Sequence, residues 1–343
     1  MFAALAVAWI MGVRVASGDA YHVERDLAQR VKGVLAKTIT VSDASSGFLK
    51  VLAFVPPNTE TQRVVSYRVR CREFPNAETF DAGDKIAKDK SYTGVRVPLS
   101  SATLGTPMHF DVTYVVDLYK TALRSGPTGS GKKASQPSEF DSQASKTVDF
   151  ESSAFKKFLD DHDLKRRPDE SNAYFAYRAF HILSTDLAAR VDTKAPGVDP
   201  SNWQASFLSQ RSCRNGGCGF CSIQLVGILR ANGIPARLLV GRWALNTEGD
   251  YGQFHVRTDF FDPSIGWIPV DPTFGMMAVQ HGDNPDVNFG GTDGNFITFH
   301  LNSEVSPEGC NFYMPIHQFE VVAYDGTERC TPQITETWTV TKQ

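Results

Sequence analysis

The chain has 343 residues, of which 41% are hydrophobic, 21% charged and 11% aromatic, and its formal net charge at pH 7 is −3. This composition is typical of a soluble globular protein long enough for two domains, and it excludes a chain that is disordered throughout. Because the chain has no basic excess, we do not expect nucleic acid as a partner.

Residues 1–13, MFAALAVAWIMGV, form an apolar run that is followed by small residues suited to cleavage near Ala16–Ala20. The run is too short to span a bilayer comfortably and has the length of a signal-peptide core. No Lys or Arg precedes it, so an N-terminal helix packed on a domain is the alternative. We expect residues 1–20 to be a signal peptide, no stable membrane span, and a secreted or periplasmic protein.

Residues 21–122 are expected to form a β-sandwich domain. Runs such as FLKVLAFV, RVVSYRVRC and MHFDVTYVVDLY are rich in β-branched and aromatic residues, and turn clusters such as PPNTE and FPNAE separate them. No helical pattern intervenes between the runs, which favours a sandwich over a parallel sheet.

Residues 123–150 are small and polar, which is typical of a flexible linker. Within them, GPTGSGK at 126–132 matches the opening of a phosphate-binding loop. Lys133 stands where such a loop needs a Ser or Thr for Mg²⁺, and no helical pattern follows, so a linker is favoured.

Helical periodicity begins after the linker, in AFKKFLDDH and NAYFAYRAFHILSTDLAARV. A third helix is expected to start near Cys218 and to close at Gly233 and Pro235. Strand-like runs follow, so the order of elements predicts an α+β fold. We expect a core domain at residues 151–300, extended by strands in residues 301–343.

Cys218 follows two glycines and opens the predicted helix, in the segment GGCGFCSIQLVGILRANGIPAR. A thiolate is the nucleophilic form of cysteine, and the amino end of a helix stabilises it. A backbone N–H at the helix start can also face a developing oxyanion. A lone cysteine is more often a small buried apolar residue, so this feature alone is weak evidence.

A thiol nucleophile needs a base, and the base needs an acceptor that orients it. His255 falls in a strand-like run, and Asp271 ends a second run after GWIPV. Two adjacent antiparallel strands would bring these residues side by side, with the imidazole facing Cys218 and Asp271 through its two nitrogens. We therefore expect Cys218, His255 and Asp271 to form a catalytic triad.

In these motifs the sequence resembles the transglutaminase-like superfamily: a glycine-flanked cysteine, GIPAR, a strand histidine and GWIPVDPT. The resemblance covers roughly Ser152 to Thr298. It implies a papain-like α+β transglutaminase core, with the nucleophile helix packed on an antiparallel sheet and a β domain in front. It also implies acyl transfer at amide bonds through a thioester, on a peptide or protein substrate and without cofactor or metal.

Other residues near the motifs are candidates for contact with the substrate: Trp203, Gly217, Gly219 and Arg257. Arg257 marks a departure, because the family usually reads HAW where this chain reads HVR. Trp203 is more simply explained as a packing residue.

The cysteines leave alternatives open. We expect a disulfide between Cys310 and Cys330, which flank one strand-like segment, if the protein is exported. Cys218 and Cys221 form a CxxC, which allows a redox pair or half of a zinc site instead of a triad. The GIPAR and DPT segments have no role in those alternatives, so the triad is favoured.

The triad alone does not determine which molecule accepts the acyl group from the thioester. Water would make the protein a protease or amidase, which the resemblance favours, and an amine would make it a crosslinking protein-glutamine transamidase. A catalytically silent binding or scaffold domain is a further alternative, which an intact triad argues against. The oligomeric state cannot be read from these patterns.

Overall fold

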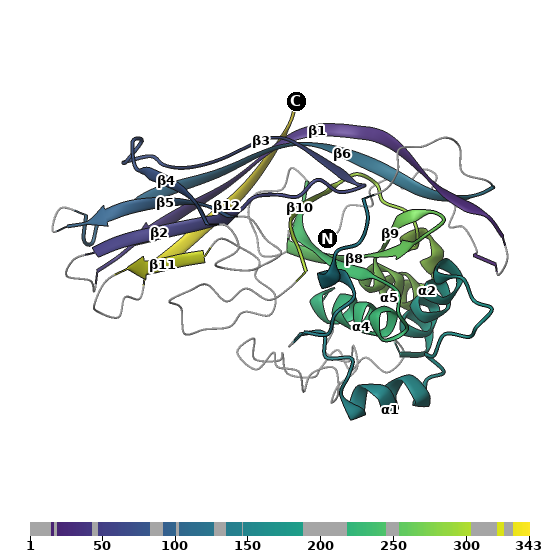
Figure 1. The fold of residues 1–343 in the computed structure, drawn as a ribbon. Coiled ribbons are helices and arrows are strands. Elements are labelled where there is room, and N and C mark those ends of the chain that lie inside the picture. The colour runs from purple at the N-terminus through teal and green to yellow at the C-terminus, as the bar shows by residue number, and fades with distance from the viewer. Residues whose placement is uncertain are drawn as a thin grey trace. The chain divides into compact units, whose positions relative to one another are not determined.

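The computed structural model has an α+β fold, as predicted, with mostly antiparallel sheets (Figure 1). The chain divides into two compact units. Unit 1 holds residues 1–26, 120–238 and 256–293, and unit 2 holds residues 27–119, 239–255 and 294–343. The structure describes residues 15–16, 19–42, 47–82, 92–100, 103–126, 135–145, 147–187, 218–244, 254–302, 321–325 and 332–343.

Two antiparallel sheets of four strands each occur in the order β12-β1-β6-β3 and β11-β2-β5-β4. Their strands are β1 (Tyr21–Thr40), β2 (Gly47–Phe54), β3 (Gln62–Cys71), β4 (Glu78–Ala82), β5 (Tyr92–Leu99), β6 (Met108–Ser125), β11 (Val321–Asp325) and β12 (Gln333–Lys342). In β1, buried residues alternate with partly exposed ones from Val31 to Thr40. This period of two gives the sheet one apolar face, which needs a partner layer.

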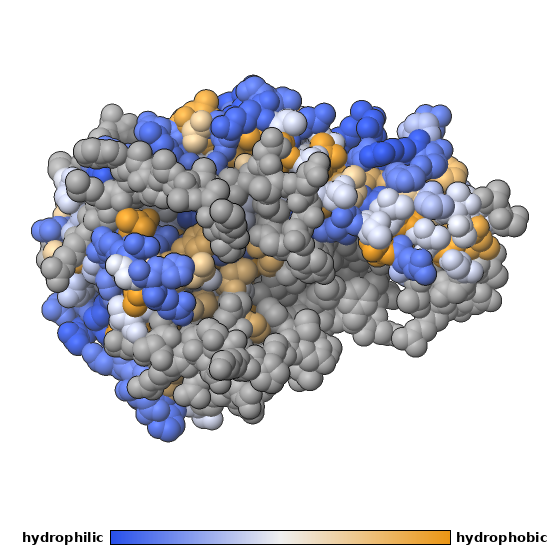
Figure 2. Space-filling model, turned by 180° about the vertical axis from the view of Figure 1, so that it is seen from behind, coloured by the Kyte–Doolittle hydropathy of each residue, from blue (hydrophilic) through white to orange (hydrophobic). Residues whose placement is uncertain are grey.

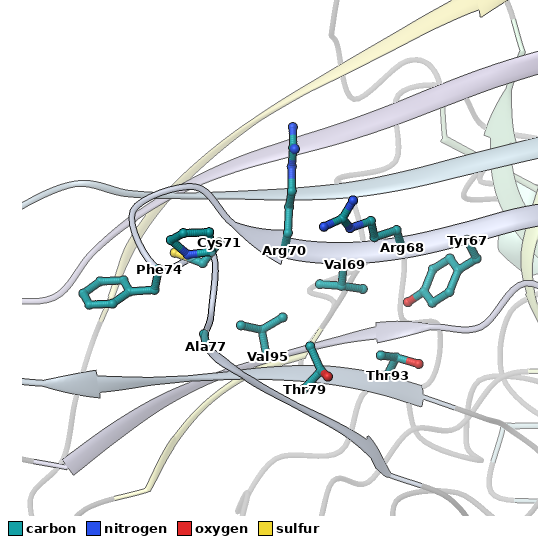
Figure 3. A pocket seen from close by; sticks show the side chains of 11 residues that line it. Tyr67, Arg68, Val69, Arg70, Cys71, Phe74, Ala77, Thr79, Thr93 and Val95 are labelled. Atoms are coloured by element: carbon teal, nitrogen blue, oxygen red, sulfur yellow. The ribbon is translucent and has the colours of Figure 1, made fainter.

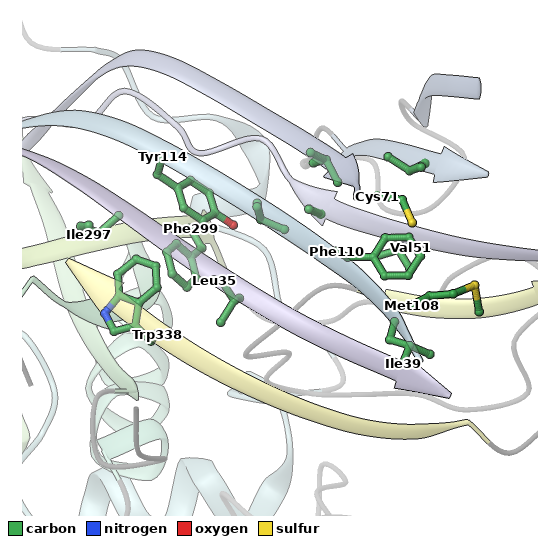
Figure 4. Packing of buried hydrophobic residues seen from close by; sticks show 14 of the residues in the cluster. Leu35, Ile39, Val51, Cys71, Met108, Phe110, Tyr114, Ile297, Phe299 and Trp338 are labelled. Carbon is green, nitrogen blue, oxygen red and sulfur yellow. The ribbon is translucent and has the colours of Figure 1, made fainter. Parts of the chain in front are cut away.

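The apolar faces of these two sheets share one hydrophobic core, so they form a sandwich. Leu35 and Phe110 enter from one sheet and Val51 from the other, while the rings of Phe299 and Trp338 meet edge-on at one end (Figure 4). At position 33, the indole of Trp338 occupies the space in which a Cβ would lie, so glycine fits there without a clash. The packing therefore depends on this small residue in β1.

Buried carboxylates on the outer face of β6 hold clusters of arginine. Asp117 accepts hydrogen bonds from Arg30 at 2.6 Å and from Arg63 at 3.0 Å. Asp111 accepts from Arg72 at 2.7 Å and from Arg70 at 3.1 Å. The hydrogen bond from Arg30 is the main cause that lowers the pKa of Asp117 to about 2. Each cluster thus carries two positive charges and one negative charge.

A third sheet has the order β10-β7-β8-β9. Its strands are β7 (Ala236–Trp243), β8 (Phe254–Asp262), β9 (Gly266–Val270) and β10 (Phe296–Leu301). β8 and β9 are antiparallel and joined by a tight turn, and Thr258 lies opposite Val270. This register fixes which residues of β8 lie beside the end of β9.

The helices belong to unit 1. They are α1 (Ser153–Asp161), α2 (Asn172–His181), α4 (Cys218–Ala231) and α5 (Pro272–His281), with a π-helical turn η2 (Ile182–Leu187) and 3₁₀ turns η1 (Glu139–Asp141) and η7 (Pro285–Asn288). Ser152 and Ser171 cap the amino ends of α1 and α2 by accepting a hydrogen bond from a backbone N–H. Every residue of α4 from Gly219 to Arg230 is buried, which is typical of a helix that is apolar on all sides.

Part of the segment between β6 and α1 is hydrogen-bonded to other elements of unit 1. The indole N–H of Trp267 donates to the carbonyl of Ser135 at 2.9 Å, and Arg230 donates to the carbonyl of Gln143 at 2.9 Å. The phosphate-loop-like residues 127–132 lie outside the described residues, as does the proposed signal segment up to residue 14. Among the residues that are described, no helix combines the length and the apolarity needed to cross a bilayer.

Candidate active site

Cys218 is the first residue of α4, as the sequence predicts, and its thiol is free and partly exposed. The first backbone N–H groups of a helix have no partner inside the helix, so they favour negative charge nearby. Gly219 supplies one of these groups and is itself buried. The amino end of α4 therefore presents a thiol together with backbone hydrogen-bond donors.

One turn further along α4, Ser222 fixes the helix against β8. Its hydroxyl donates to the backbone carbonyl of Val256 at 3.1 Å, and Ser222 is fully buried. Residues four apart lie on the same face of a helix, so Ser222 and Cys218 share a face. Val256 directly follows His255 in the chain. The face of α4 that carries the thiol is thus the face that contacts β8.

His255 lies near the start of β8 and is buried, with 5% of its surface exposed. Its ring stacks on the indole of Trp243 with centroids 5.0 Å apart, and the ring of Phe296 approaches it edge-on at 6.1 Å. These aromatic contacts restrict the orientation of the imidazole. Trp243 and Phe296 were not singled out in the sequence, where they look like ordinary strand residues.

Asp271 follows β9 directly and is the N-cap of α5. Its Oδ1 accepts a hydrogen bond from the N–H of Phe274 at 3.0 Å, and its own N–H donates to the carbonyl of Asn288 at 2.9 Å. Pro272 occupies the first turn of α5, where it needs no hydrogen bond. Asp271 is 1% exposed, so capping and backbone contacts hold its carboxylate in one orientation inside the protein.

Arg257, expected to contact substrate, is buried and pairs with Asp271. Its Nε lies 3.6 Å from Oδ2 of Asp271, and its guanidinium donates to the carbonyl of Gly291 at 3.3 Å. The register of β8 and β9 explains this pairing, because the next residues after Thr258↔Val270 are Arg257 and Asp271. His255 and Arg257 are two residues apart, so they share a face of β8.

The arginine of the GIPAR motif also makes a buried ion pair. Arg237 donates to Oδ2 of Asp259 at 3.0 Å, and its guanidinium lies 3.8 Å from the centre of the Trp267 ring. The side chains of Arg237 and Asp259 are 6% and 2% exposed. The arginine of the motif, on β7, therefore contacts Asp259 on β8 and Trp267 on β9.

We expect Arg237→Met to lower the free energy of unfolding by about 3–5 kcal/mol, because it leaves the Asp259 carboxylate buried without its cation. Urea unfolding followed by tryptophan fluorescence measures this loss. The matched control is Arg167→Met, which removes an exposed ion pair to Asp163 and should cost less than about 1 kcal/mol. Equal losses in the two variants would contradict a structural role for the Arg237–Asp259 pair.

The CxxC alternatives find no support in the geometry. Cys218 and Cys221 are not bonded to each other, and the buried sulfur of Cys221 lies 3.8 Å from the sulfur of Met276. Among the described residues, no group of three or more His, Cys, Asp or Glu side chains could hold a metal ion.

Several residues singled out in the sequence have no described position. Trp203 and Gly217, expected near the substrate, lie outside the described residues. Cys310 and Cys330 do so as well, and their disulfide stays a prediction.

Comparison with known proteins agrees with these motifs. The family model of the transglutaminase-like superfamily matches residues 166–272. A curated protein-glutamine gamma-glutamyltransferase from Pseudomonas aeruginosa is 37% identical over 89 residues, which are 24% of this chain and 12% of that protein. The matched segment is thus a small part of that relative's length.

Two solved structures are also similar. The structure of a candidate cysteine protease from Cytophaga hutchinsonii aligns with 94% of this chain and 100% of its own, at 12% identity and a TM-score of 0.50. The periplasmic domain of TgpA from Pseudomonas aeruginosa aligns over 70% of this chain and 90% of its own, at 13% identity and a TM-score of 0.23. At this identity, the first of these alignments shows a shared fold.

Proposed function

We propose that the protein is a cysteine-dependent enzyme that transfers acyl groups from amide bonds, because residues 166–272 match the family model of the transglutaminase-like superfamily. Cys218 is the nucleophile, His255 the general base and acid, and Asp271 the residue that orients the imidazole. Each belongs to a different element: the start of α4, β8 and the turn after β9.

The Cys218 thiolate attacks the carbonyl carbon of the amide, and the carbon–nitrogen bond then breaks to leave a thioester on the sulfur. His255 takes the thiol proton and gives it to the departing amine or ammonia. In the second half, His255 takes a proton from the acceptor, which attacks the thioester and releases Cys218. Backbone N–H groups at the start of α4, including that of Gly219, are suited to stabilise the oxyanion.

The hydrogen bond from Ser222 to Val256 is the observation that carries the proposal. It orients one face of α4 toward β8, one helical turn from Cys218 and one residue from His255. The cap and ion pair of Asp271 give independent support, because they hold its carboxyl group in one place at the end of β9.

Water is the acceptor that we propose, so the reaction is hydrolysis of an extracytoplasmic peptide or protein. The fold shared with a candidate cysteine protease supports this choice. Transfer to an amine is the second candidate, because the curated relative is a protein-glutamine gamma-glutamyltransferase. A secreted or periplasmic location is proposed from the apolar run at residues 1–13.

One assay separates the two acceptors. The protein is incubated with a glutamine-containing peptide library and a labelled primary amine, and both ammonia or amine release and label incorporation are measured. We expect release to exceed incorporation by at least about tenfold, since water is present at far higher concentration than the amine. Incorporation that outruns release would reject hydrolysis in favour of transamidation while leaving the roles of Cys218 and His255 intact.

A further inference from the structure

Among the described residues, no strand joins β3 to β4 along one side of the sandwich of unit 2. Each is the last strand of its sheet, and a pocket of about 250 Å³ lies between them (Figure 3). Val69, Cys71, Phe74, Ala77 and Val95 form its apolar lining. Drug-sized ligands usually occupy pockets of about 300–1,000 Å³, so this pocket better fits one or two side chains of a polypeptide.

The backbone of β3 is suited to pair with a further strand. The N–H of Arg72 donates to His109 of β6 at 2.8 Å. Groups in a strand alternate in direction, so Val69 and Cys71 turn their N–H and C=O groups away from β6. In the part of the chain that the structure describes, no strand pairs with this side of β3. The free edge therefore borders the pocket.

The outer face beside this edge is positively charged. Arg70 and Arg72 share the single carboxylate of Asp111, and more than half of each arginine side chain is exposed. Arg68 is also exposed, and among the described residues it has no ion pair. In Figure 2, hydrophilic side chains cover much of the described surface over β1, β3 and β6. The chain as a whole has a net charge of −3, so this excess is local.

We propose that the β3 edge binds an extended segment of a partner protein in which acidic and apolar residues alternate. Alternate side chains of such a strand point to opposite faces. The apolar ones enter the pocket beside Val69 and Cys71, and the acidic ones lie beside Arg68 and Arg70. A second copy of the chain is a poorer occupant, because pairing of two β3 strands would place arginines against arginines. This proposal does not depend on the function proposed above.

The test uses a fluorescent peptide of seven residues in which valine alternates with glutamate. Fluorescence anisotropy with the intact protein should show saturable binding at least about fivefold tighter than that of a matched valine–lysine peptide. Methylating alternate backbone nitrogens of the peptide should abolish binding, because strand pairing needs those N–H groups. Higher salt should weaken binding, because the charge contacts are exposed.

Substitutions test whether the peptide binds at the β3 edge. Arg68→Glu reverses one exposed charge and should weaken binding about fivefold, whereas the matched reversal Lys156→Glu on α1 should change it less than twofold. Thr79→Trp fills the pocket from β4 and should also weaken binding. Circular dichroism checks that both variants of unit 2 are folded.

Four results would overturn the proposal: no saturable binding, equal affinity for the lysine peptide, binding insensitive to backbone methylation, or binding unchanged in Arg68→Glu. Light scattering tests whether a second copy of the chain binds the β3 edge instead. A concentration-dependent dimer that Arg68→Glu abolishes would assign the edge to a second copy and reject an acidic partner.

Discussion

Cys218→Ala is expected to reduce amide cleavage by a factor on the order of 10⁶, the loss typical of removing the nucleophile of a catalytic triad. No other thiol among the described residues can replace it. Cys221 is buried in α4, and burial raises the pKa of the Cys71 thiol to about 11, so Cys71 stays protonated at neutral pH. Steady-state kinetics on a glutamine or peptide amide measure the effect, and thermal unfolding confirms that the variant is folded.

Cys221→Ala is the matched control for this experiment. It makes the same chemical change three residues away, at a sulfur that contacts Met276 inside the protein. We expect activity within about threefold of the original protein, with a modest loss of stability from the small cavity. Equal loss of activity in both variants would instead support a redox or metal role for the CxxC pair.

Asp271→Asn is expected to lower kcat by about 10⁴-fold with little change in KM, because the amide disturbs the tautomer and orientation of His255 while the nucleophile and base remain. An asparagine can still cap α5, since its side-chain oxygen accepts the N–H of Phe274. The fold should therefore persist, which urea unfolding checks. Activity within tenfold of the original would contradict a catalytic role for Asp271.

Two substitutions of Arg257 test the same carboxylate from its ion-pair partner. Arg257→Leu removes the cation beside Asp271, and Arg257→Lys keeps the charge but loses the planar donor geometry. If the pair positions the carboxylate, the leucine variant should lose more kcat than the lysine variant. Identical losses would show that the charge beside Asp271 has no part in catalysis.

Local signals in the sequence predicted much of the candidate site. The glycines before Cys218 and the apolar run after it predicted the start of α4, and Gly233 predicted its end, where that residue adopts a positive φ of 72°. The resemblance of GWIPVDPT to the family motif marked Asp271 as a candidate, and in the structure this residue caps α5. These features depend on neighbouring residues only, so a single sequence can reveal them.

Contacts between distant segments were not predictable in the same way. The ring of His255 contacts Trp243 on β7 and Phe296 on β10, and the aromatic residues of a strand look alike until the register is known. The pairing of β12 with β1, which sets Leu35 opposite Trp338, joins the two ends of the chain. Arg257 was expected to contact the substrate because it stands in the segment that departs from the HAW of the family, and strand pairing, which the sequence does not reveal, places it beside Asp271.

The central claim is that Cys218 carries the acyl group as a thioester, and acid quenching tests it most directly. The protein is mixed with an activated amide or ester substrate, stopped in acid within the first turnovers, digested and mapped by mass spectrometry. We predict one acyl adduct, on the peptide that contains Cys218, and no adduct after His255→Ala at neutral pH. An adduct on Cys71 or Cys221, or turnover that persists in Cys218→Ala, would contradict the assignment.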